Sequence, residues 1–181
     1  MAVAVICHPH PLHGGTLNNK VVHQLAKTFA DLGAVSIRFN FRGVGDSEGE
    51  YDEGEGEYND LMAVVKWALD RWPGLPLWLA GFSFGGFIAL SAAQLVQPAR
   101  LVTVAPAVNY FPERNLHLED VDWLLIQGDA DDIVPAEHVL TWIDELTCQP
   151  RLALIKGAGH FFHGRLNELK KTIIDVFEDV A

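Results

Sequence analysis

The chain has 181 residues, 49% of them hydrophobic, which suits one domain over residues 1–181 around a single core. Its formal net charge of −11 repels nucleic-acid phosphates and anionic lipid surfaces, so neither nucleic acid nor a membrane is expected as a partner. No apolar run approaches the roughly 20 residues that a membrane-spanning helix needs.

The cysteines and the N-terminus bear on the compartment. Cys7 and Cys148 lie far apart and form no CxxC motif, which suits a reducing compartment better than a disulfide framework. The apolar start, MAVAVIC, lacks the basic flank and the cleavage site of a secretory signal, and it predicts a core strand instead. We therefore expect a cytoplasmic protein.

Six short, β-rich apolar runs alternate with longer segments of helical period. The predicted strands cover residues 2–7, 36–41, 77–81, 101–105, 123–128 and 151–155. Near-continuous apolar strands are typical of a parallel sheet that helices cover on both faces. The pattern therefore predicts the α/β class, with a doubly wound, mainly parallel sheet of about six strands.

The segments between the strands carry helix signals. Asn18 or Asn19 can cap a helix that runs to about Leu32, and Gly33 occupies the position of a left-handed C-terminal residue. Four further helices are predicted: one that ends at Trp72, one over 84–96, one that begins near Pro135 and one over 166–180. The acidic, Gly-rich stretch 48–58 predicts a solvated loop before the second of these helices.

The sequence GFSFGG, residues 81–86, lies directly between a predicted strand and a predicted helix. A serine in such a tight turn exposes its hydroxyl at the carboxyl end of the sheet, and small residues on either side avoid clashes. Ser83 is therefore the candidate nucleophile, and the backbone amide of Phe84 is a candidate oxyanion donor. The competing interpretation is a glycine-rich turn that only packs the helix against the strand.

A serine nucleophile needs a histidine base and a carboxylate that orients it. His160 follows the strand 151–155, and three acids, Asp129, Asp131 and Asp132, follow the strand 123–128. Both segments lie at carboxyl ends of strands, where open α/β sheets gather their ligands. The sequence alone does not separate the three acids, and His163 is a possible rival base.

These motifs resemble the α/β-hydrolase superfamily, in particular its small lidless members with an HPHPxxGG start. The resemblance covers nearly the whole chain through five motifs: HPHP with Gly14 and Gly15, FNFRGVGDS at 39–47, GFSFGG, GDADDIVP at 128–135 and GAGHFF at 157–162. It implies a triad of Ser83, His160 and Asp131. It also implies that the second oxyanion amide belongs to His10 or an adjacent residue.

The histidines near the N-terminus raise the question of a metal. His8, His10 and His13 could be ligands, but no carboxylate or cysteine accompanies them at ligand spacing, so no metal is expected. No GxGxxG follows the first strand, so no dinucleotide cofactor is expected either. Arg42 and Asp46 are interpreted as residues that fix their loop.

The chain departs from the superfamily's usual pattern in two places. It begins on the strand that carries the oxyanion loop, without the preceding antiparallel strands, so the strand 36–41 becomes an open edge. We expect either a shortened chain or a homodimer that covers this edge. The sequence leaves the oligomeric state, monomer or homodimer, open. Only residues 106–120 separate the fourth and fifth strands, which leaves no room for a lid.

Together these features predict a serine hydrolase that cleaves carboxylic esters with small or short-chain acyl groups through an acyl-enzyme. The expected partner is thus a small-molecule acyl substrate. A thioesterase or an amidase would use the same residues. The alternative from another class is a catalytically silent binding or scaffold protein that kept the fold.

Overall fold

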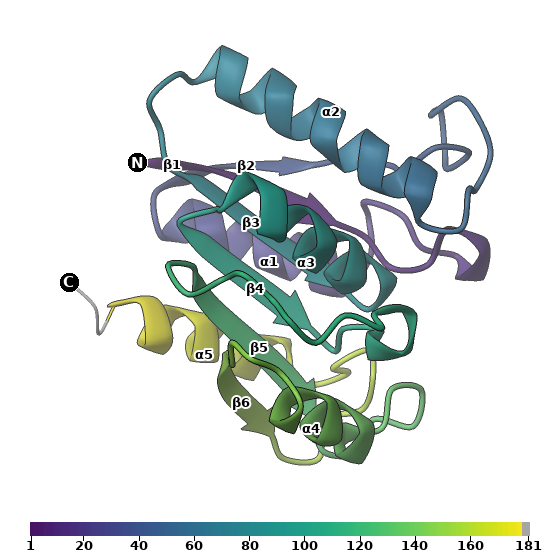
Figure 1. The fold of residues 1–181 in the computed structure, drawn as a ribbon, viewed down its shortest axis with the longest axis vertical. Coiled ribbons are helices and arrows are strands. Elements are labelled where there is room, and N and C mark those ends of the chain that lie inside the picture. Colours follow the sequence, from purple (N-terminus) through teal and green to yellow (C-terminus); the bar gives the residue numbers. More distant parts are fainter. Residues whose placement is uncertain (179–181) are drawn as a thin grey trace.

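The computed structural model describes residues 1–178. Six parallel strands form one sheet in the order β2-β1-β3-β4-β5-β6, which confirms the expected fold class (Figure 1). The strands are β1 (Ala2–Cys7), β2 (Ala34–Arg38), β3 (Leu77–Phe82), β4 (Arg100–Val104), β5 (Asp122–Gly128) and β6 (Arg151–Ile155). As expected, β2 is an edge strand.

Helices cover both faces of the sheet, with α1 and α5 on one side and α2, α3 and α4 on the other (Figure 1). Their bounds are α1 (Lys20–Asp31), α2 (Glu55–Arg71), α3 (Phe84–Val96), α4 (Ala136–Asp144) and α5 (Leu166–Glu178). The expected end of the last helix, Val180, lies outside the described residues. In residues 1–178, no helix is both long and apolar enough to cross a membrane.

The first helix shows why its ends lie where they do. The Asn19 side chain accepts hydrogen bonds from the amides of Val21, at 2.9 Å, and Val22, at 3.3 Å, so Asn19 and not Asn18 is the cap. Gly33 has a φ of 86°, in the left-handed region that glycine adopts without strain. Both end signals in the sequence are therefore confirmed.

Two predicted boundaries are wrong. The strand predicted over 36–41 ends at Arg38, because the chain then turns inward and buries Phe41 against the His8 ring, 4.7 Å away. The helix α2 begins at Glu55, inside the stretch predicted as a loop. The buried Glu57 carboxylate accepts the amides of Gly54 and Asp52 and so starts the helix early.

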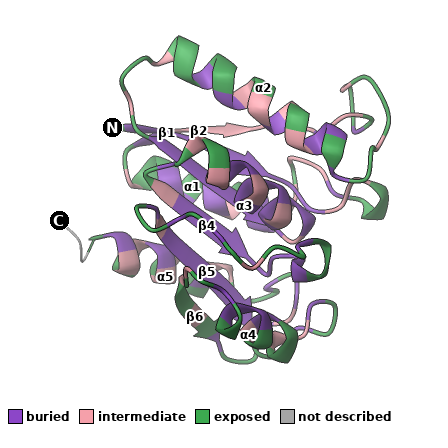
Figure 2. Ribbon diagram, viewed as in Figure 1, coloured by how far each residue is buried: buried purple, intermediate pink, exposed green. Residues whose placement is uncertain are grey.

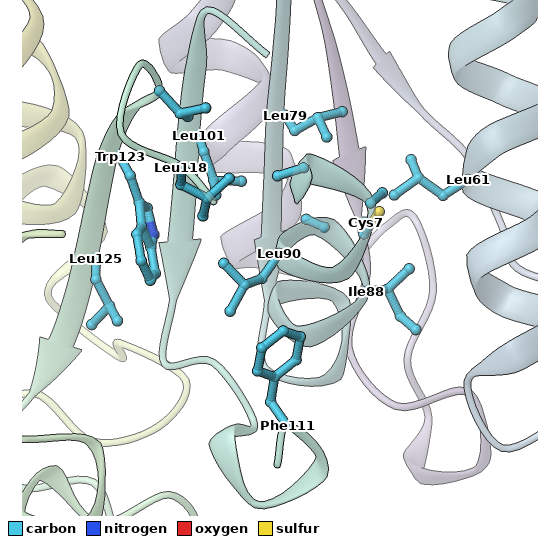
Figure 3. Close-up of a cluster of buried hydrophobic side chains, with 14 of the residues drawn as sticks. Cys7, Leu61, Leu79, Ile88, Leu90, Leu101, Phe111, Leu118, Trp123 and Leu125 are labelled. Atoms are coloured by element: carbon cyan, nitrogen blue, oxygen red, sulfur yellow. The ribbon is translucent and has the colours of Figure 1, made fainter. Parts of the chain in front are cut away.

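The sheet separates two apolar clusters, and its central strands are buried on both faces (Figure 2). On the α3 side, Leu79, Leu90, Leu101 and Trp123 pack together between strands and helix (Figure 3). Between β4 and β5 the chain forms a single 3-10 turn, Val108–Tyr110, and no helical lid. The carboxyl edge of the sheet is thus left open, and the chain segments after β1, β3, β5 and β6 all emerge there.

Candidate active site

Ser83 occupies the turn between β3 and α3 with φ 56° and ψ −119°. A non-glycine residue rarely adopts a positive φ, and such strain persists only where the surrounding structure enforces it. Here the Ser83 amide donates to the Val104 carbonyl at 2.9 Å, and the Ser83 carbonyl accepts the Ala107 amide at 3.1 Å. The turn is therefore fixed from the neighbouring strand β4, and the serine is half-buried at the sheet edge.

The glycines on either side of Ser83 are required because there is no room for a side chain at their positions. A Cβ on Gly81 would lie 2.0 Å from the Gly85 carbonyl oxygen. A Cβ on Gly85 would lie 2.4 Å from the carbonyl oxygens of Cys7 and His8. Because backbone atoms cannot give way as a flexible side chain can, the pattern G-x-S-x-G is needed for α3 to begin this close to β1.

His160 links Ser83 to Asp131. Its Nε2 lies 3.0 Å from Ser83 Oγ, and its Nδ1 lies 2.8 Å from Asp131 Oδ2. An ionised carboxylate only accepts, so Nδ1 carries the proton and Nε2 presents its lone pair to the serine hydroxyl. The structure therefore brings the three predicted residues into one hydrogen-bonded chain, with the His160 and Asp131 side chains almost fully buried.

The structure separates the three acids that the sequence left open. Asp131 alone contacts His160, whereas Asp129 accepts the Gly157 amide at 2.6 Å and Asp132 is exposed. Burial by itself would raise the pKa of Asp131. Hydrogen bonds from His160 and from the amides of Val134 and Ile133 outweigh burial and hold that pKa below its ordinary value.

The two candidate oxyanion amides belong to Phe84 and His10. Phe84 is the first residue of α3, so its amide has no carbonyl partner within the helix. The His10 carbonyl accepts the amides of His13 and Gly15, both at 3.0 Å, which closes the loop after β1. The rings of His10 and Phe84 lie 5.0 Å apart, so both residues border the same space beside Ser83.

The loop after β1 is fixed by His8, a residue that the sequence suggested only as a metal ligand. The His8 Nδ1 donates to the Pro9 carbonyl at 2.7 Å, and Nε2 accepts the Phe41 amide at 3.1 Å. The bond from the Phe41 amide requires the neutral ring, because a protonated Nε2 cannot accept. Burial lowers the pKa of His8 to about 4. The side chain thus ties the candidate oxyanion loop to the chain after β2.

This buried histidine makes the fold sensitive to acid. The unfolded state binds a proton at His8 near pH 6.5 and the folded state only near pH 4. The contribution of His8 to the unfolding free energy is therefore complete above pH 6.5 and is lost as the pH falls towards 4. When the pH falls from 7.5 to 5, His8 should lower the unfolding free energy of the wild type by about 2 kcal/mol. We expect this part of the fall to be absent in His8→Leu. Urea unfolding at both pH values measures it.

The matched control for this measurement is His23→Leu, because His23 is exposed. This variant should keep the acid sensitivity of the wild type. An unchanged pH dependence in His8→Leu would show that His8 is not the group that titrates.

The remaining candidates lie outside this cluster. His163 is exposed, and Arg42 binds Asp60 with its Nη2 2.9 Å from the carboxylate, as expected of a residue that fixes its loop. Asp46 is exposed. Among residues 1–178, no group of three or more histidine, cysteine or acidic side chains is arranged to hold a metal ion.

Two hollows adjoin Ser83, and both are also lined by His10, His13 and Ile133. The first, about 140 Å³, is completed by Pro9, Gly14, Gly15, Asn19, His160 and Phe161. The second, about 220 Å³, is completed by Phe84, Ala107, Asn109, Tyr110 and Val134. None of these lining residues is a lysine, an arginine, an aspartate or a glutamate.

Comparison with known proteins agrees with this architecture. A family model described as serine aminopeptidase, S33, matches residues 9–121, more than half of the chain. An α/β serine hydrolase homologue from Coxiella burnetii is 44% identical, with a TM-score of 0.90 over 99% of this chain and 85% of that one. A lidless α/β serine hydrolase from Xanthomonas campestris is 40% identical, with a TM-score of 0.90 over 98% and 81% of the two chains.

A curated relative extends the comparison. An uncharacterized protein of Rickettsia prowazekii is 36% identical over 96% of this chain and 77% of its own length. The family model and the two structures share the serine-hydrolase description, and the fold described above is the one that those structures have. The chain therefore belongs to the α/β serine hydrolases, in the family of the S33 serine aminopeptidase model, and resembles its lidless members.

Proposed function

We propose that the protein is a serine esterase that hydrolyses small, uncharged carboxylic esters. The observation that carries the proposal is the unbroken hydrogen-bonded chain from Ser83 Oγ through His160 to Asp131, at 3.0 and 2.8 Å. A serine hydroxyl is inert at neutral pH unless a base takes its proton, and His160 Nε2 is placed to do so.

The reaction would follow the acyl-enzyme route. Ser83 Oγ attacks the ester carbonyl carbon while its proton moves to His160 Nε2, and Asp131 stabilises the imidazolium that forms. The amides of Phe84 and His10 would bind the oxyanion. His160 then gives the proton to the leaving oxygen. A water molecule, activated by the same histidine, cleaves the acyl-enzyme and releases the acid.

The two hollows can be assigned from the proton's path. His160 must reach the leaving oxygen, so we assign the alcohol to the hollow that His160 and Phe161 line. The acyl chain then enters the hollow lined by Phe84, Ala107 and Tyr110. With a volume of about 220 Å³ and no lid above it, this hollow suits a short acyl chain.

A lining without acidic residues, lysine or arginine favours esters over the other substrates of this mechanism. An aminopeptidase must bind the free ammonium group of its substrate, and no carboxylate lines either hollow. A thioester carrier with phosphate groups would find no lysine or arginine there and would meet a chain of net charge −11. A neutral alcohol needs neither counter-ion.

The test of this assignment is acyl selectivity. Wild-type kcat/KM should be measured for p-nitrophenyl acetate, butyrate and octanoate, together with an aminoacyl p-nitroanilide. We expect hydrolysis of the short esters, a decline towards octanoate and no cleavage of the anilide. Ala107→Leu, which adds bulk to the acyl hollow, should lower the butyrate-to-acetate ratio about tenfold.

The control variant is Phe161→Ala on the alcohol side, because it leaves the acyl hollow intact. It should change kcat/KM for p-nitrophenyl acetate and for p-nitrophenyl butyrate by a similar factor. Cleavage of the anilide but not the esters would replace the esterase with a peptidase. The absence of any hydrolysis in a folded wild type would favour the catalytically silent binding protein.

A further inference from the structure

Gln127 is a fully buried polar residue beside the candidate triad that the mechanism above does not use. It lies on β5, two residues after Leu125 and four after Trp123, so the alternation of the strand points it to the same face as those apolar side chains. A primary amide in such a row costs free energy unless its polar atoms find partners. Its position therefore calls for a specific reason.

The nitrogen of this amide is surrounded by oxygen atoms. The two N–H bonds of Gln127 Nε2 are shared among three acceptors: the Val134 carbonyl at 2.9 Å, Asp131 Oδ2 at 3.2 Å and the Gly128 carbonyl at 3.3 Å. The Oε1 atom has no hydrogen-bond partner. The opposite orientation of the amide would set Oε1 against three acceptors, so these contacts fix the nitrogen in this place.

Asp131 is consequently held by four donors. Its Oδ1 accepts the amides of Ile133, at 2.9 Å, and Val134, at 2.8 Å. Its Oδ2 accepts His160 Nδ1 at 2.8 Å and Gln127 Nε2 at 3.2 Å. The oxygen that orients the histidine is therefore shared between a ring and a side-chain amide.

We infer that Gln127 is a positioning residue of the hydrolase, which sets how strongly Asp131 holds the proton-accepting histidine. This inference rests on the proposed function for its effect on the rate, and on the geometry alone for its effect on the ring. Gln127 also binds the Val134 carbonyl, so it joins β5 to the far end of the loop that carries Asp131.

The consequence of losing the amide has a definite direction. Without the Gln127 donor, the full charge on Oδ2 faces His160 Nδ1–H and stabilises the imidazolium. Two backbone amides still hold Oδ1, so the carboxylate stays in place. The rings against His160 are those of Phe82 and Phe161. The other titratable groups around the ring are His10 and His13, which line the same hollow, and the exposed Asp129 and Asp132. Asp131 is thus the charge that acts on the ring.

The experiment compares the wild type with Gln127→Met, a substitution of similar length without a donor that suits the apolar row. In the wild type and the variant, the ring of His160 is titrated by NMR and the acid limb of kcat/KM for p-nitrophenyl acetate is measured. We expect both midpoints to rise by about one pH unit, the scale of one hydrogen bond to a charged group.

The matched control is Thr103→Val, which removes another buried hydrogen bond, from Trp123 Nε1 at 3.0 Å, without touching the triad. It should leave both midpoints where they are in the wild type. An unmoved NMR midpoint in folded Gln127→Met would overturn the inference. A wild type that hydrolyses no ester, with a midpoint that still shifts in the variant, would overturn the proposed function and leave the role of Gln127 standing.

Discussion

Replacing Ser83 with alanine is expected to lower kcat for p-nitrophenyl acetate by about 10⁶-fold. Among residues 1–178, the Ser83 hydroxyl is the nucleophile that His160 Nε2 contacts, at 3.0 Å, and without it the base has no nucleophile to activate. Alanine adopts the same strained turn with a smaller side chain, so the fold and the hollows should persist. A fluorophosphonate probe should label the wild type and not the variant.

Ser91→Ala is the matched control for this loss. Ser91 lies two turns further along α3, where its hydroxyl donates to the Phe87 carbonyl at 2.8 Å. Its removal should leave labelling and turnover unchanged. Full labelling of Ser83→Ala would show that the probe reacts elsewhere and that the nucleophile is a different residue.

The sequence was informative where local chemistry decides the structure. Asn19 and Gly33 mark the ends of α1 because a side-chain cap and a left-handed residue act within one turn of the helix. Gly81 is equally local, since a Cβ there would meet the backbone of Gly85, four residues along the chain. These signals need no knowledge of distant contacts.

The sequence was uninformative where a residue's role depends on a partner far along the chain. His8 accepts a hydrogen bond from the amide of Phe41, 33 residues further along the chain, and the HPHP motif does not predict that contact. The residues alone do not show which of the three acids after β5 meets His160. The family resemblance implied Asp131, and the structure places Asp131 against His160, 29 residues further along the chain. In the sequence Gln127 is an ordinary strand residue, because its role depends on the contacts of its side-chain nitrogen with Asp131 and Val134.

The wrong start of α2 has a different origin, because the contacts that set it are local. Composition alone makes residues 48–58 a solvated loop, because acidic residues and glycine disfavour a packed element. In the structure, one of these acids, Glu57, is buried and satisfies the amides of Asp52 and Gly54. A carboxylate in the first turn is also favoured by the helix dipole, so a residue counted as loop-forming becomes the one that starts the helix.

Asp131→Asn should separate orientation from charge at the candidate triad. An asparagine amide nitrogen in place of Oδ2 donates, so it would force His160 Nδ1 to accept and move the ring proton to Nε2. The base would then face Ser83 with a proton already in place. We expect kcat to fall about 10⁴-fold with little change in KM, because the hollows are not altered. Steady-state kinetics on p-nitrophenyl acetate measures both constants.

Asp129→Asn and Asp132→Asn are the matched controls, since both carboxylates lie within two residues of Asp131 and neither contacts His160. Each should keep kcat within about threefold of the wild type, the range expected of a surface substitution. If Asp132→Asn lost as much activity as Asp131→Asn, Asp132 would have to take the place of Asp131 beside His160 during turnover. If Asp131→Asn kept wild-type activity, His160 would not depend on the carboxylate that it contacts at 2.8 Å.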